Sequence, residues 1–226
     1  VGSSAVRKLT GKGYAKLAFR DDVSGNLSYV DFSYGNPLLV EIKDSIDSYH
    51  PEISPDGNKV AFSTGFEGVS GKSSVYVRNL DASGSGPVRL EVENAAIPRW
   101  RVLKNGDTAI VYVTYAGDNK AEAWSGASTW QVPFSKGAFG TPEKLFDGAF
   151  HGGVSLDGTL AVTGSKELKA NKNGTVETWY GGEQACNVSL GMDSLKQTLF
   201  LDFAGSAGQS FVGHSYVTHE VALGAY

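Results

Sequence analysis

The chain has 226 residues, with 20 basic and 24 acidic side chains, 29 glycines and only 7 prolines. Because the prolines are few and the glycines follow no Gly-X-Y period, the composition excludes collagen and Pro-rich disorder, and 41% hydrophobic residues are enough for a buried core. The net charge of −4 provides no basic face for nucleic acid, and no apolar run reaches the ~18 to 20 residues of a membrane helix.

The predicted elements are short strands joined by glycine turns, and one strand-turn-strand arrangement recurs along the chain. Its five copies cover residues 5–19, 49–64, 96–113, 150–163 and 185–203. Third strands are expected at 27–32, 73–80, 129–134, 176–180 and 211–217, and fourth strands at 38–42, 88–92 and 143–146. No helical period is found, so the sequence predicts an antiparallel all-β chain.

Two copies align without a gap and identify the repeat. His50 matches His151, Ser54 matches Ser155, and both copies turn at Asp-Gly. Successive copies lie roughly 35 to 55 residues apart, which is the length of a β-propeller blade. We therefore predict one β-propeller domain over 1–226, with about five four-stranded antiparallel blades at 1–46, 47–93, 94–148, 149–183 and 184–226. A β-sandwich is the alternative, but it gives no reason for the repeat.

The segment from His50 to Phe62 resembles the blade signature of the TolB-like β-propellers, and the segment from His151 to Val162 repeats it. Residues 97–101, 128–134 and 183–187 resemble a paralogous family of predicted lipoproteins from fibre-degrading gut bacteria. This resemblance implies a bacterial extracytoplasmic location (periplasmic, outer-membrane-associated or secreted) and is compatible with a lost lipid anchor. TolB-like propellers close with six to eight blades, so five blades indicate a five-bladed ring or a fragment of a larger one.

The candidate ligand-binding residues lie on the first strands of the repeats. His50 and His151 share one repeat position and are expected near a mouth of the central channel, with Arg99 and Arg101 from the third copy. Such a group suits an anionic or polyhydroxyl ligand, or a metal. The alternative is that each histidine caps its strand and bonds to the next blade. Trp100, between the arginines, is expected to be buried.

Secondary candidates are His214, Glu220 and Glu52. His214 and Glu220 share one face of a predicted strand. The spacing of the histidines in this segment differs from the spacing that a zincin metal site requires. Glu52 aligns with Arg99, Gly153 and Asn187, so no ring of carboxylates emerges. Asp56 and Asp157 are interpreted as turn residues. A single Cys186 permits no cysteine-based zinc site, and we predict no catalytic residue, cofactor or metal.

The expected function is a non-catalytic extracytoplasmic propeller module that binds a protein partner or a glycan. The alternative is a five-bladed carbohydrate-active enzyme, similar to a glycoside hydrolase, with channel carboxylates among Glu52, Asp202 and Glu220. A structural stalk or assembly subunit is a third interpretation.

Overall fold

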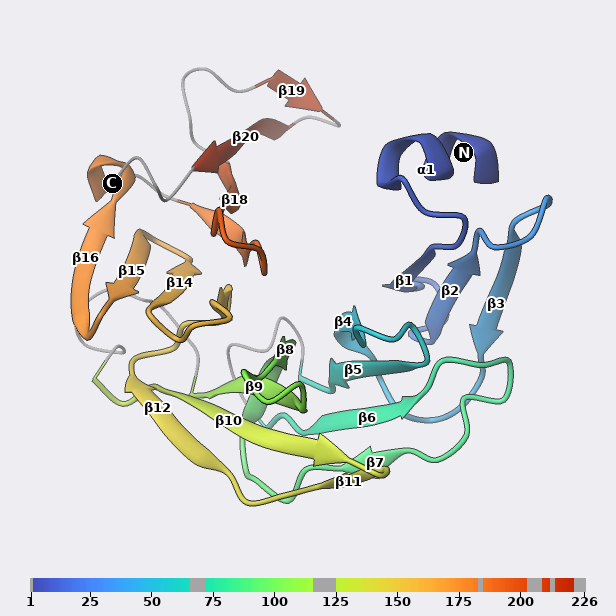
Figure 1. Cartoon of the computed structure of the whole chain (residues 1–226), viewed down its shortest axis with the longest axis horizontal. Helices are drawn as coiled ribbons and strands as arrows, with labels where there is room; N and C mark the ends of the chain where they lie inside the picture. Colours follow the sequence, from blue (N-terminus) through green and yellow to red (C-terminus); the bar gives the residue numbers. More distant parts are fainter. Residues whose placement is uncertain are drawn as a thin grey trace. The chain divides into compact units, whose positions relative to one another are not determined.

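The computed structural model describes residues 2–65, 72–115, 125–182, 185–202, 209–211 and 214–221. Strands that are consecutive in the chain pair into antiparallel sheets, and α1 (Ser3–Thr10) precedes the first of them (Figure 1). The chain divides into two compact units, Val1–Trp100 and Arg101–Tyr226. The predicted all-β fold class, a β-propeller type built from antiparallel blades, is confirmed. The predicted blade boundaries stay a prediction.

The first unit contains two sheets that share an apolar core. The first sheet has the order β1 (Lys16–Arg20), β2 (Leu27–Asp31), β3 (Leu38–Ile42). The second has the order β4 (Tyr49–Ile53), β5 (Lys59–Ser63), β6 (Val75–Asn79), β7 (Val88–Arg89). The core between them consists of buried side chains from both sheets: Leu27, Tyr29, Ile42, Val60, Phe62 and Leu80.

The remaining strands form three further sheets. The division between the units falls within β8 (Ala95–Val102). This strand begins a sheet with the order β8, β9 (Thr108–Thr114), β10 (Ser128–Ser135), β11 (Ala138–Phe139). A fifth strand, β12 (Glu143–Asp147), also pairs with β10. The next is β13 (Gly153–Val154), β14 (Leu160–Gly164), β15 (Leu168–Lys172), β16 (Thr175–Trp179). The last has the order β17 (Cys186–Leu190), β18 (Thr198–Asp202), β20 (His214–Val221), β19 (Gln209–Phe211).

Two of the second strands, β9 and β14, have both of their faces covered and are largely apolar. Residues 109–113 of β9 and 160–163 of β14 are all buried. A short uninterrupted apolar run between turns is typical of such a strand. Because a strand presents alternate residues to opposite faces, each of these sheets is packed on both sides.

The repeated Asp-Gly turns are held by a serine hydroxyl. The Ser54 hydroxyl donates to Asp56 Oδ1 at 2.5 Å and accepts from the Lys59 N–H at 2.9 Å. Ser155 makes the same two bonds, to Asp157 at 2.7 Å and from Leu160 at 3.1 Å. These contacts support the structural interpretation of Asp56 and Asp157.

The strand expected within residues 5–9 is wrong, because this segment is helical. α1 ends at Gly11, whose φ of 68° is left-handed and whose N–H bonds to the Arg7 carbonyl. Arg7 and Lys8 lie in the last turn, where cations interact favourably with the helix dipole. Glycine in this conformation is the usual end of a helix. The first sheet therefore has only three strands among the described residues.

Two later predictions of strand order are also corrected. The third strand of its sheet is β15, and the strand predicted at 176–180 corresponds to β16, the fourth. The sequence Leu-Lys-Ala-Asn-Lys of β15 lacks the β-branched and aromatic residues that indicate a strand, and buried Leu168 and Ala170 hold it in place. The strand predicted at 211–217 is divided between β19 and β20.

Gly57 has a φ of +74°, and a Cβ there would meet no atom within 4 Å. We expect Gly57→Ala to lower the free energy of unfolding by about 1 kcal/mol, because an L-residue is strained in this conformation. Gly13 is the matched control, since it has the same open space without a left-handed φ. Urea unfolding of both variants measures the difference, and equal stabilities would contradict the role given to the Gly57 backbone.

Candidate functional site

The turns place the first strands of four sheets in a common register. In each, one N–H at the start of the turn bonds to the carbonyl at its end: Ser54 to Lys59, Leu103 to Asp107, Ser155 to Leu160 and Gly191 to Gln197. Four residues before these donors lie His50, Arg99, His151 and Asn187. Three of the predicted ligand-binding residues therefore occupy one repeat position, two of them in the first unit and one in the second.

This register shifts the sequence alignment by two residues in two copies of the repeat, those at 96–113 and 185–203. The alignment matched Pro98 to Pro51, whereas the turn bonds match Trp100 to Pro51. The equivalents of Glu52 are therefore Arg101, Gly153 and Ser189, and none of them is a carboxylate. The two prolines therefore do not occupy equivalent positions. The Asn-Gly turn is the better reference point for the alignment, because its geometry requires glycine.

His50 lies in a β-bulge between Tyr49 and Glu52, where its φ is +51°. Asn187 has the same φ in the matching bulge between Cys186 and Ser189. A bulge changes the direction of a side chain relative to the regular strand, and strained backbone of this kind is common at binding sites. Both side chains at this position are thus directed by a backbone feature that the structure repeats.

Glu52 is joined to Trp100 by two hydrogen bonds. The Trp100 backbone N–H donates to Glu52 Oε2 at 2.7 Å, and the indole Nε1 donates to the Glu52 carbonyl at 3.0 Å. Trp100 is buried, as predicted. Burial raises the pKa of Glu52 to about 7, although the Arg99 charge and the Trp100 N–H both act to lower it. The first unit thus holds a carboxyl group that titrates near neutral pH beside a guanidinium.

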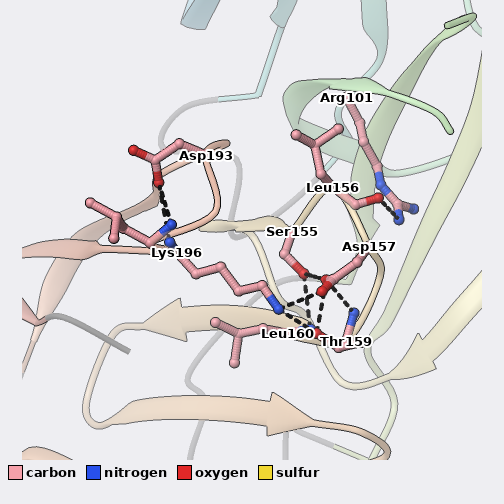
Figure 2. Close-up of polar contacts among 9 residues, drawn as sticks. Arg101, Ser155, Leu156, Asp157, Thr159, Leu160, Asp193 and Lys196 are labelled. Carbon is pink, nitrogen blue, oxygen red and sulfur yellow. Dashed lines mark hydrogen bonds and ion pairs between the residues drawn. The ribbon is translucent and has the colours of Figure 1, made fainter. Parts of the chain in front are cut away.

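Arg101 is 8% exposed, and its guanidinium is engaged inside the second unit. One Nη donates to Gln131 Oε1 at 2.7 Å. The other donates to the Leu156 carbonyl at 3.4 Å, as Figure 2 shows. Burial lowers the pKa of Arg101, while Asp157 and Glu143 act to raise it. Its role as a ligand-binding residue stays a prediction, and these bonds show that it joins β8 to β10 and to the turn between β13 and β14.

Asp157 is the centre of a polar cluster that the sequence did not indicate (Figure 2). Lys196 Nζ donates to Asp157 Oδ2 at 2.6 Å and to Thr159 Oγ1 at 2.7 Å. The Lys196 bond, together with the Ser155 hydroxyl, holds the pKa of Asp157 well below its ordinary value. No local motif distinguishes Lys196, because its partner lies 39 positions earlier in the chain.

Three further candidate residues are placed by their position on the strands. His151 lies partly buried just before β13. The strand register places His214 opposite Phe211 and Glu220 opposite Leu199. The described residues contain no group of three His, Cys, Asp or Glu side chains that could hold a metal ion. No described helix has the length and apolar character that a membrane crossing requires.

No protein-family model matches the chain, and no curated protein matches it. Among solved structures, a Mycobacterium tuberculosis puromycin-hydrolyzing peptidase is similar at 15% identity and a TM-score of 0.49, over 93% of this chain and 37% of that one. An acylaminoacyl peptidase from Pyrococcus horikoshii is similar at 14% identity and a TM-score of 0.38, over 85% of this chain and 42% of that one. An endo-1,4-beta-xylanase from Bacteroides thetaiotaomicron is similar at 11% identity and a TM-score of 0.39, over 93% of this chain and 76% of that one. The chain thus spans less than half of each peptidase, and at these TM-scores the similarities carry no argument about function.

The raised pKa of Glu52 predicts that stability falls as the pH rises. Between the ordinary pKa of 4.5 and about 7 the folded chain keeps a proton that the unfolded chain has released, so the free energy of unfolding decreases. The total decrease is up to about 3 kcal/mol. Glu52→Gln keeps an acceptor for the Trp100 N–H and should remove this decrease.

Urea unfolding at several pH values between 4.5 and 8 measures the effect. Exposed Glu91→Gln is the control and should reproduce the wild-type profile. If Glu52→Gln shows the same pH dependence as the wild type, the titration of Glu52 is not its source.

Lys196 and Asp157 provide a test of the polar cluster. Lys196→Met should lower the free energy of unfolding by about 1 kcal/mol, because the lysine bonds a carboxylate and a hydroxyl at once. The exposed pair Lys144–Asp147, also at 2.6 Å, is the control, and Lys144→Met should have almost no effect. Unfolding in low and high salt checks both, since salt should reduce the Lys196 effect.

Proposed function

We propose that the chain is a non-catalytic binding module of β-propeller type that attaches a protein partner or a glycan outside the cytoplasm of a bacterium. The observation that carries this proposal is an exposed apolar face on the sheet β1–β2–β3. The location rests on the resemblance to predicted lipoproteins and on no structural feature.

The exposed face is a row of aliphatic side chains across three strands. Leu17 lies opposite Val30, and Val30 lies opposite Leu39. Leu17 is 55% exposed and Leu39 is 64% exposed, and partly buried Phe19 follows on the same face. The other face, with Ala18 and Val40, packs against the core of the unit. Exposed apolar side chains that gather on one face favour contact with a partner.

Exposed aromatic rings next to this sheet are compatible with either kind of partner. Tyr14 precedes β1, Tyr34 lies between β2 and β3, and both are more than half exposed. A tyrosine ring provides an apolar surface with a polar end, which suits both protein and sugar surfaces.

The test measures binding of the intact chain to a glycan array and to extracytoplasmic proteins of a fibre-degrading bacterium. We expect one saturable ligand whose affinity falls at least tenfold in the double variant Leu17→Lys, Leu39→Lys. Val23→Lys is the control, because Val23 is also exposed but lies in the loop between β1 and β2. Equal losses in the control variant, or no ligand in either screen, would overturn the proposal.

A second candidate function is a carbohydrate-active enzyme, and the pKa of Glu52 favours it. A carboxyl group that keeps its proton near neutral pH can act as a general acid toward a glycosidic oxygen. Hydrolysis of plant polysaccharide that is lost in Glu52→Gln while the fold is kept would establish this function. Hydrolysis that is equal in both proteins would exclude Glu52 as its acid.

A further inference from the structure

β1 corresponds to the second strand of the other sheets. Its sequence Lys16-Leu17-Ala18-Phe19 matches Lys59-Val60-Ala61-Phe62 of β5, and both strands follow a glycine turn. β1 also packs against β4, as the second strand β14 packs against β17. The first sheet therefore starts at the position that β5 and β14 occupy in theirs.

The other sheets have a strand that β1 lacks. β4 pairs with β5, β13 with β14 and β17 with β18. In each case the first strand lies on the edge of the second strand that faces away from the other strands of the sheet. In the first sheet β1 is the end of the order, and the chain before it forms α1. No described strand therefore covers this edge of β1.

The backbone groups that face this edge, and that pair with no described strand, are identified by the register with β2. Phe32 N–H bonds to Ala15 O and Asp21 N–H bonds to Asn26 O, so the odd-numbered residues between them also point toward β2. The N–H and C=O groups of Lys16, Ala18 and Arg20 consequently point outward. Their matches in β5 are Lys59, Ala61 and Ser63. Lys59 O accepts from Ser54 N–H, and Ala61 and Ser63 lie opposite residues of β4.

Burial also differs between the two strands. Val60, Ala61 and Phe62 are completely buried. Leu17 is 55% exposed, and Ala18 and Phe19 are only partly buried. Because the sequences are nearly the same, the difference comes from the surroundings: β5 pairs with β4 at its edge, and its Val60 and Phe62 pack in the core with Leu27, Tyr29 and Ile42.

We propose that β1 accepts an extended strand from a partner polypeptide, which pairs antiparallel with Lys16–Arg20 and covers Leu17 and Phe19. This inference rests on the proposed binding function and names its partner as a protein segment. Addition of a strand to a sheet edge provides backbone hydrogen bonds for affinity and alternate side chains for specificity. The donor has apolar residues at alternate positions and no charge facing Leu17 or Phe19, since an unpaired charge buried there is unfavourable.

The test follows amide hydrogen exchange of the whole ¹⁵N-labelled chain by NMR with a synthetic peptide of the β4 sequence, residues 48–54. We expect the amides of Ala18 and Arg20 to exchange at least tenfold more slowly when the peptide is present. The amides of Leu17 and Phe19, which already pair with β2, should change little and serve as internal controls. The same peptide N-methylated at its Glu52 and Ser54 nitrogens should give no protection, because it lacks the donors.

The free peptide could fail to protect these amides only because it binds weakly. A second protein therefore carries a copy of residues 48–54 joined to its N-terminus by a flexible Gly-Ser linker, which supplies a millimolar effective concentration. Unprotected Ala18 and Arg20 amides in the tethered protein would overturn the proposal. Protection that rises with protein concentration in the absence of peptide would assign the edge to a second copy of the chain, and would also overturn it. If a ligand from the binding screens depends on Leu17 and Leu39 but leaves the Ala18 amide unprotected, the binding function stands and the strand addition fails.

Discussion

The hairpin turn between the first and second strands is the constraint on which the rest of the structure depends. In two sheets a serine hydroxyl bonds to the aspartate carboxylate and receives a backbone N–H five residues ahead. This closes the turn at one length, and the length sets which residues of the first strand lie opposite the second. A slip of one residue would send every side chain of that strand to the opposite face. The position shared by His50 and His151 is therefore a consequence of the turn.

The same turns are where cations from neighbouring sheets attach. Lys16 of β1 donates to the Gly57 carbonyl at 2.9 Å, Arg101 of β8 donates to the Leu156 carbonyl, and Lys196 donates to Asp157. A tight turn exposes carbonyl oxygens and a carboxylate that the ladder does not use, so it attracts positive side chains. Each contact joins two sheets of one unit. Arg101, which the sequence suggested as a ligand-binding residue, is thus one of the side chains that hold two sheets together.

The sequence predicted those parts of the fold that depend on local chemistry. Asp-Gly turns and uninterrupted apolar runs have short-range causes, so the copies at His50 and His151 and the strands after them could be recognised. Two features depended on contacts distant in the chain and could not: β15 is a strand because Leu168 and Ala170 are buried, and Lys196 finds its partner 39 residues away. Residues 3–10 were assigned to a strand because the repeat favoured one, although the end of the helix at Gly11 is a local feature. The two-residue shift in the alignment of Glu52 with Arg99 is visible only in the hydrogen bonds of the turns.

Glu52 shows how one residue serves the fold and still leaves chemistry available. Oε2 accepts the Trp100 N–H, so this oxygen is fixed in direction whether or not the group is charged. The carbonyl oxygen of a protonated carboxyl group is a better acceptor than its hydroxyl oxygen, so the Trp100 bond favours Oε1 as the atom that carries the proton retained near neutral pH. Binding and catalysis therefore make different demands on this residue. A binding module needs only the Trp100 contact, which keeps β4 against β8, whereas an enzyme needs Oε1 to reach a substrate oxygen. Because Glu52→Gln preserves the first and removes the second, the same substitution separates the two functions.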